Sequence, residues 1–146
     1  FVQIGLRGYW PPVDVWRWMR ERGMRWHLME EIERDGLDAV LDRALAEMAE
    51  HADSIYLSVD IDVVDPGSAP GTGTPEPGGL MPRELLRAVR RVALETKLVA
   101  LDVVEVSPPY DGPAGVTAEV AHRVVLETLS ALASKRSGRT PGPVSP

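Results

Sequence analysis

The chain has 146 residues and contains no cysteine. Without cysteine there are no disulfide bonds, no thiolate nucleophile and no zinc-thiolate centre. The chain also has no uninterrupted run of about 18 apolar residues, the length that a helix needs to cross a bilayer. We therefore expect a cytoplasmic protein with no membrane partner, whose chemistry depends on oxygen and nitrogen side chains.

Positive charge is also in short supply, because 16 basic residues face 22 acidic ones and the net charge is -6. Surfaces that bind nucleic acid carry clustered basic residues, so we expect no nucleic-acid partner. The same balance favours a cationic ligand. The apolar and charged fractions, 44% and 26%, are ordinary for a globular protein, and the length suits a single domain.

The chain lacks an initiator methionine and begins inside an apolar run, Phe1 to Leu6. This start predicts that the chain is part of a larger domain, to which residues 1–134 belong. Residues 135–146 are rich in Ser, Gly, Pro and basic residues, which predicts a disordered tail.

Apolar patterns along the chain alternate between strand and helix. Continuous apolar runs predict strands, and apolar residues at helical spacing predict the helices between them. The expected strands are 1–6, 24–29, 54–61 and 98–106, and the expected helices are 14–23, 36–51, one that opens at 81–84, and 117–133. This order predicts an α/β fold of three layers, a parallel sheet with helices on both faces.

The strand at 54–61 runs directly into two carboxylates, Asp60 and Asp62. Because side chains alternate along an extended chain, we expect both to point to the same side. Two like charges so close repel each other unless a cation or protons intervene. Oxygen donors of this kind suit a hard divalent cation, Mg²⁺ or Mn²⁺.

The loop that follows has a strongly biased composition. Four prolines and five glycines lie between positions 66 and 79. Fixed φ at proline and permissive φ at glycine predict a loop of defined shape. Since ligands of parallel sheets bind beyond the carboxyl ends of the strands, Asp60, Asp62 and Glu105 are the candidate site residues.

Two stretches resemble a known family. The string SVDIDVVDPGSAPGTGTPEPGGL at 58–80 resembles the C-terminal signature of the ureohydrolases, the arginase and agmatinase family, and LDVVEVSPPYD at 101–111 is a second match in the family order. With QIGLR at 3–7 and the final helix, the resemblance extends to about Ala133. It is strongest to agmatinase.

The resemblance implies a binuclear enzyme with two Mn²⁺ ions that hydrolyses a guanidino compound, agmatine to putrescine and urea. Asp60 would bridge the two metals and Asp62 would bind one of them. Glu105 would bind the substrate guanidinium, and Thr74 would lie near the substrate. The family also implies a homo-oligomer, a trimer or hexamer.

The family's upstream Gly-Gly-Asp-His and Asp-Ala-His-x-Asp elements, which supply the other metal ligands, do not occur here. His27, His51 and His122 have no ligand-like spacing, so we interpret them as structural. The chain therefore resembles the C-terminal half of a ureohydrolase, and we expect it to be inactive without the N-terminal half.

Two other functions stay open on the sequence. One is a ureohydrolase for another substrate, such as guanidinobutyrate, guanidinopropionate or formiminoglutamate. The other is a non-catalytic fragment or assembly module. Three further interpretations are structural. Asp65 before Pro66 suits a turn, Asp102 suits a hydrogen-bonding role within its strand, and the acidic residues between positions 30 and 35 suit a solvated face.

Overall fold

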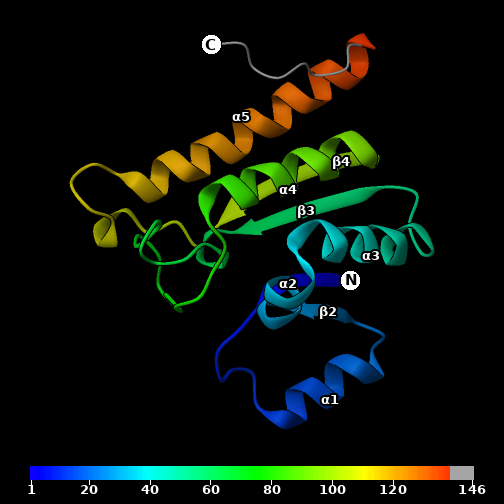
Figure 1. Cartoon of the computed structure of the whole chain (residues 1–146), viewed down its shortest axis with the longest axis horizontal. Helices are drawn as coiled ribbons and strands as arrows, with labels where there is room; N and C mark the ends of the chain where they lie inside the picture. Colours follow the sequence, from blue (N-terminus) through cyan, green and yellow to red (C-terminus); the bar gives the residue numbers. More distant parts are fainter. Residues whose placement is uncertain (139–146) are drawn as a thin grey trace.

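The computed structural model describes residues 1–138, drawn as a ribbon in Figure 1. Strands and helices alternate as predicted, with one additional short helix, α2. No helix among these residues is long and apolar enough to cross a membrane. In chain order the elements are β1 (Val2–Leu6), α1 (Val13–Glu21), β2 (Arg25–Leu28), α2 (Met29–Asp35), α3 (Leu37–Ala49), β3 (Ile55–Asp60), the 3₁₀ turn η1 (Ile61–Val63), α4 (Pro82–Glu95), β4 (Leu98–Val104), the 3₁₀ turn η2 (Pro108–Tyr110) and α5 (Val116–Ser137).

The four strands form two parallel pairs. In the first pair β1 lies beside β2, with Ile4 opposite His27. In the second pair β3 lies beside β4, with Asp60 opposite Val104. The α/β class and the parallel pairing are confirmed. The predicted single sheet is divided, because no strand within residues 1–138 joins the edge of β1 to the edge of β3.

Helices lie on both faces of the β1–β2 pair. The ring of Trp26 on β2 packs against Trp16 of α1, with 4.9 Å between the ring centroids. The next residue, His27, is buried and contacts Glu31 of α2 and Glu47 of α3. Because successive strand residues point to opposite faces, α1 covers one face and α2 with α3 cover the other. Figure 1 shows β2 between α1 and α2.

The β3–β4 pair has one covered face. Val59 packs with Val89 of α4 and Val124 of α5 in the larger of the two apolar cores. On the opposite face Tyr56 and Ser58 are exposed, so this side of the pair is open in the described part of the chain. The alternation of buried and exposed residues in β3 is the pattern expected of a half-buried strand.

The last helix is longer than predicted. α5 runs to Ser137 and ends at Gly138, whose φ of 64° is the left-handed conformation that glycine adopts without a steric penalty. Lys135 lies in the last turn of α5 and donates a hydrogen bond to the carbonyl of Thr96 at 2.6 Å. The predicted tail therefore began too early. Its remaining part, 139–146, lies outside the described residues.

The connection between η1 and α4 contains the loop at positions 66–79, hereafter the 66–79 loop. Val64 and Leu80 form a bridge at its base, where the amide of Leu80 donates to the carbonyl of Val63 at 2.8 Å. The loop lies at the carboxyl ends of β3 and β4, in green and beside the arrowheads in Figure 1. The same end of the strands carries Asp60 and Glu105.

Candidate active site

Asp60 and Asp62 lie close together, but not by the alternation that the sequence predicted. β3 ends at Asp60, and Asp62 lies in η1. The backbone turns there, and the amide of Asp62 donates a hydrogen bond to Oδ1 of Asp60 at 3.2 Å. The assumption of an extended chain was wrong for this stretch. Asp60 caps the 3₁₀ turn η1 by accepting from the amide of Asp62, and this turn brings the two carboxylates together instead.

The pKa of Asp60 is raised to about 6. Partial desolvation of its carboxyl is the largest cause, although the residue as a whole is exposed. The hydrogen bond from the Asp62 amide opposes the shift, and the negative charges of Asp62 and Glu105 add to it. Three carboxylates therefore influence one another at the strand ends, and a bound cation would relieve their repulsion.

Glu105 has a strained backbone. Its φ is 62°, and it is the one residue other than glycine with positive φ among residues 1–138. The left-handed conformation is costly for a side chain with a Cβ atom, and such outliers are concentrated at functional sites. Glu105 follows Val104, the partner of Asp60 in the sheet register, so this conformation sets the direction of its carboxylate beside Asp60.

Thr74 joins the 66–79 loop to the carboxylate pair. Its hydroxyl Oγ1 donates to Oδ2 of Asp62 at 3.1 Å. The neighbouring Gly73 lies beside Glu105, because a Cβ atom placed there would be 3.8 Å from Oε2 of Glu105. The four residues predicted from the sequence, Asp60, Asp62, Thr74 and Glu105, are thus brought to one place.

Asp65 holds both ends of the loop. Its Oδ1 accepts from the amide of Gly67 at 2.9 Å, and its Oδ2 accepts from the amides of Gly78 and Gly79 at 2.8 and 3.3 Å. These backbone donors, that of Gly67 first, hold the pKa of Asp65 below its usual value. The predicted turn role of Asp65 is confirmed, and the residue additionally closes the loop across 14 positions.

A second attachment was not predicted from the sequence. Asp111 accepts hydrogen bonds from the amides of Thr117 and Ala118 and thereby caps α5. The hydroxyl of Thr117 in turn accepts from the buried amide of Gly71 at 2.8 Å. Asp111 lies six residues before Thr117, outside the spacing of a helix cap, so neither this contact nor the contact with Gly71 was indicated by the sequence.

Arg7, which follows β1, is the other residue that the sequence did not place in the site. Its guanidinium donates to the carbonyl of Asp62 at 2.6 Å, to the carbonyl of Glu76 at 2.6 Å and 3.1 Å, and to the carbonyl of Pro77 at 3.2 Å. It is half-buried and connects the end of β1 to η1 and the 66–79 loop.

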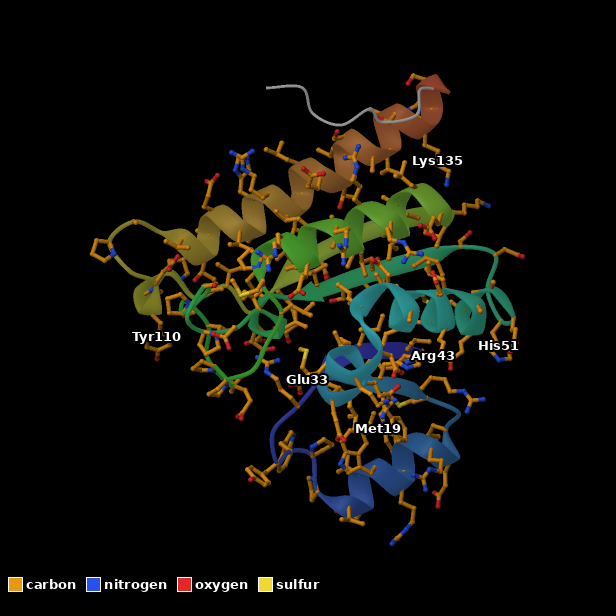
Figure 2. All side chains as sticks on the ribbon, viewed as in Figure 1. Met19, Glu33, Arg43, His51, Tyr110 and Lys135 are labelled. Carbon is orange, nitrogen blue, oxygen red and sulfur yellow. The ribbon has the colours of Figure 1, made fainter. Side chains whose placement is uncertain are left out.

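The histidines lie elsewhere. His27 is 6% exposed, and its ring nitrogens lie 3.2 Å from Glu31 and 3.3 Å from Glu47. Glu31 is therefore a contact of the core and not part of a purely solvated acidic face. His51, labelled in Figure 2, lies between the end of α3 and the start of β3, whereas Asp60 is the last residue of β3. His122 is exposed on α5, 3.6 Å from Glu119.

Asp102 has the hydrogen-bonding role that the sequence predicted. It accepts a hydrogen bond from the hydroxyl of Tyr56 across the β3–β4 pair. The bond from Tyr56, followed by one from Ser58, keeps the pKa of Asp102 below its usual value. Asp102 therefore stabilises the open face of the pair.

The described residues fit part of a metal site. Within residues 1–138 no group of three or more His, Asp or Glu side chains is arranged to hold a metal ion. Asp60 and Asp62 nevertheless offer oxygen donors of the kind that hard divalent cations prefer. Desolvation first, and then the negative charges of Asp62 and Glu105, raise the pKa of Asp60. The remaining donors would have to come from outside these residues.

Parallel strands that carry carboxylates at their carboxyl ends, with a fixed loop above them, define an α/β protein with an enzyme-like site. Residues 1–130 match the Arginase family, so the chain belongs to that family. The predicted resemblance is thereby confirmed.

Individual relatives are similar over most of this chain. Proclavaminate amidinohydrolase of Streptomyces clavuligerus is 43% identical over 128 residues, which are 88% of this chain and 40% of that protein. Guanidinopropionase of Pseudomonas aeruginosa is 45% identical over 137 residues, covering 90% of this chain and 40% of that protein. The chain thus spans about 40% of the length of these curated relatives.

Solved structures of related enzymes have a similar fold. The crystal structure of formimidoylglutamase from Bacillus subtilis superposes with a TM-score of 0.85 at 30% sequence identity, covering 90% of this chain and 40% of that one. The two parallel pairs described above are therefore part of an arginase-like fold.

Proposed function

We propose that this chain supplies part of the active site of a manganese-dependent hydrolase that converts a guanidino compound into urea and an amine. The observation that carries the proposal is the strained Glu105, held at φ 62° beside Asp60 and Asp62. A carboxylate in a costly backbone conformation, next to a pair of metal-suited carboxylates, is the arrangement expected of a substrate-binding group.

Asp60 would bridge two Mn²⁺ ions and Asp62 would bind one of them. When bound, such ions act as Lewis acids and make water nucleophilic at neutral pH. Thr74 keeps Oδ2 of Asp62 hydrogen-bonded, which orients the carboxylate for a ligand at its other oxygen. Further ligands from an N-terminal half would complete the site, and assembly into a trimer or hexamer belongs to the same proposal.

Glu105 would hold the substrate. A planar guanidinium donates two parallel hydrogen bonds to a carboxylate, which fixes its orientation as well as its position. Glu105 would thereby present the guanidinium carbon toward the Asp60 and Asp62 side. We place agmatine first among substrates, because its second positive charge suits the net charge of -6 that this chain contributes.

A guanidino acid is the second candidate substrate. The two curated relatives with 43% and 45% identity are named for proclavaminate and guanidinopropionate, and guanidinobutyrase is also among the relatives. These names favour a carboxylate at the far end of the substrate. The difference lies outside the guanidinium subsite, so the role of Glu105 is the same for either substrate.

The test is urea release by the complete protein with Mn²⁺, using agmatine, guanidinobutyrate and guanidinopropionate in parallel. Glu105→Gln replaces the negatively charged carboxylate with a neutral amide. We expect kcat/KM to fall about 100-fold on the preferred substrate, since hydrogen bonds to charged groups contribute roughly 1.5–3 kcal/mol. The melting temperature should change little. Wild-type kinetics in this variant would remove Glu105 from the site, and a wild-type protein without manganese binding would favour a non-catalytic module.

A further inference from the structure

The side chain of Arg7 forms no hydrogen bond with a carboxylate, although Asp62, Asp65 and Glu76 are nearby. Its four hydrogen bonds all go to main-chain carbonyls, those of Asp62, Glu76 and Pro77. An arginine that paired with the Asp62 carboxylate would compete with a cation for the same oxygens. Arg7 instead leaves those oxygens free and holds the backbone on which Asp62 lies.

These contacts fix two segments relative to each other. One arm of the guanidinium reaches η1 through the carbonyl of Asp62 and the other reaches the 66–79 loop through Glu76. Glu76 lies two residues after Thr74, whose hydroxyl bonds the Asp62 carboxylate. Because the guanidinium is planar and rigid, Arg7 sets the separation of η1 from the loop and with it the orientation of the Asp62 carboxylate.

The position of Arg7 is itself determined by close packing. Gly5, two residues earlier on β1, has a φ of 91°, and a Cβ atom added there would lie 2.7 Å from Cγ2 of Val63 in η1. Only a residue without a side chain allows β1 to approach η1 this closely. The end of β1 and the turn η1 therefore pack together as one unit.

We propose that Arg7 is the positioning residue for the Asp62 carboxylate, so that cation affinity at the site depends on a side chain that touches no metal; the inference rests on the proposed manganese function. Its direct electrostatic effect has the opposite sign, since a positive charge near a cation site weakens cation binding. A positioning role and a charge role thus predict opposite results when Arg7 is removed.

The experiment is a manganese titration of the complete protein, with free Mn²⁺ followed by its electron paramagnetic resonance signal. Arg7→Ala and Arg7→Lys are compared with the wild type, and the exposed Arg17 of α1 supplies the matched control, Arg17→Lys. Lysine keeps the charge but cannot bridge three carbonyls. We expect both Arg7 variants to bind Mn²⁺ about tenfold more weakly, the loss typical for residues that support a metal ligand.

The control should bind Mn²⁺ as the wild type does. In the Arg7 variants kcat at saturating Mn²⁺ should recover toward the wild-type value, which a general loss of structure would not allow. Wild-type affinity in Arg7→Lys, or unchanged or tighter binding in Arg7→Ala, would overturn the inference while leaving the proposed function intact. If Arg7→Ala does not fold, Arg7→Lys decides. Absence of manganese binding to the wild type would overturn both.

Discussion

Glu105 combines a side chain suited to a guanidinium with a backbone conformation suited to glycine. A left-handed conformation costs a residue with a Cβ atom roughly 1–2 kcal/mol. Glycine would avoid that cost but would lose roughly 0.5–1 kcal/mol through the greater freedom of the unfolded chain. The steric cost is the larger of the two, so glutamate at position 105 makes the folded chain less stable than glycine would.

This comparison predicts different stabilities for two inactive variants. Glu105→Ala and Glu105→Gly both lack the carboxylate and should both lose urea release. Glu105→Gly should nevertheless have a free energy of unfolding higher by about 0.5–1 kcal/mol than Glu105→Ala. Urea denaturation of the complete protein measures the difference. Asp53, an exposed residue without positive φ, is the control, and there the alanine variant should be more stable than the glycine variant. If the alanine variant is also the more stable at Glu105, the strain argument is contradicted.

The sequence predicted that the candidate site residues would lie together at the strand ends, but it did not predict their geometry. Composition and strand order placed Asp60, Asp62 and Glu105 at the strand ends, and the structure brings them together. The turn at Ile61, which Asp60 caps, and the left-handed φ of Glu105 interrupt the extended backbone that the apolar pattern predicted. Arg7 was missed because its partners are main-chain carbonyls 55 to 70 positions away, which leave no pattern in the side chains.

At the scale of elements, the 66–79 loop is fixed at both its ends and its middle. Asp65 holds the ends, and Gly71 holds the middle through Thr117 and through its own carbonyl, which accepts from the amide of Ser107 at 2.7 Å. Asp111 completes this contact by accepting from Thr117. The loop is therefore attached to the start of α5, and the position of Thr74 depends on that attachment.

Gly71 is where the loop lies against Asp111 and Thr117, so Gly71→Ala should loosen the loop. A Cβ atom there would lie 2.7 Å from Cβ of Asp111 and 3.0 Å from Cβ of Thr117, distances that require a shift of the loop. Overpacking of this kind costs about 1–3 kcal/mol, and we expect that loss in urea denaturation together with weaker substrate binding. Gly112→Ala is the control, because an added Cβ at Gly112 meets nothing within 4 Å. Equal stability of the two variants would show that the attachment does not hold the loop.

Elements with a strong apolar period were predicted to within a few residues, as α1, α3 and α4 show. The helix α2 was missed because five of its seven residues are acidic or basic, a composition typical of a surface segment, and Ile32 is its one buried residue. The buried contact of His27 with Glu31 ties this helix to β2 and gives it a tertiary reason to form. Such a contact is not visible in local periodicity.

At the scale of the whole molecule, the described chain leaves surfaces that a complete catalytic domain would cover. The β3–β4 pair is open on the side of Tyr56, which is 60% exposed. Val99 of β4 and Leu129 of α5 are 63% and 58% exposed and line a groove between those elements. Unpaired strand edges and exposed apolar residues favour association.

These surfaces, together with the partial ligand set, predict that the separate 146-residue chain and the complete protein respond differently to manganese. Binding at 100 times the dissociation constant stabilises a folded protein by about 2.7 kcal/mol, so Mn²⁺ should raise the melting temperature of the complete protein measurably. The separate chain offers Asp60 and Asp62 alone, and we expect a smaller shift, no urea release and self-association by light scattering. Asp60→Asn should abolish the shift in the complete protein. Urea release by the purified chain would contradict this prediction, because it would mean that two carboxylates and Glu105 suffice for hydrolysis.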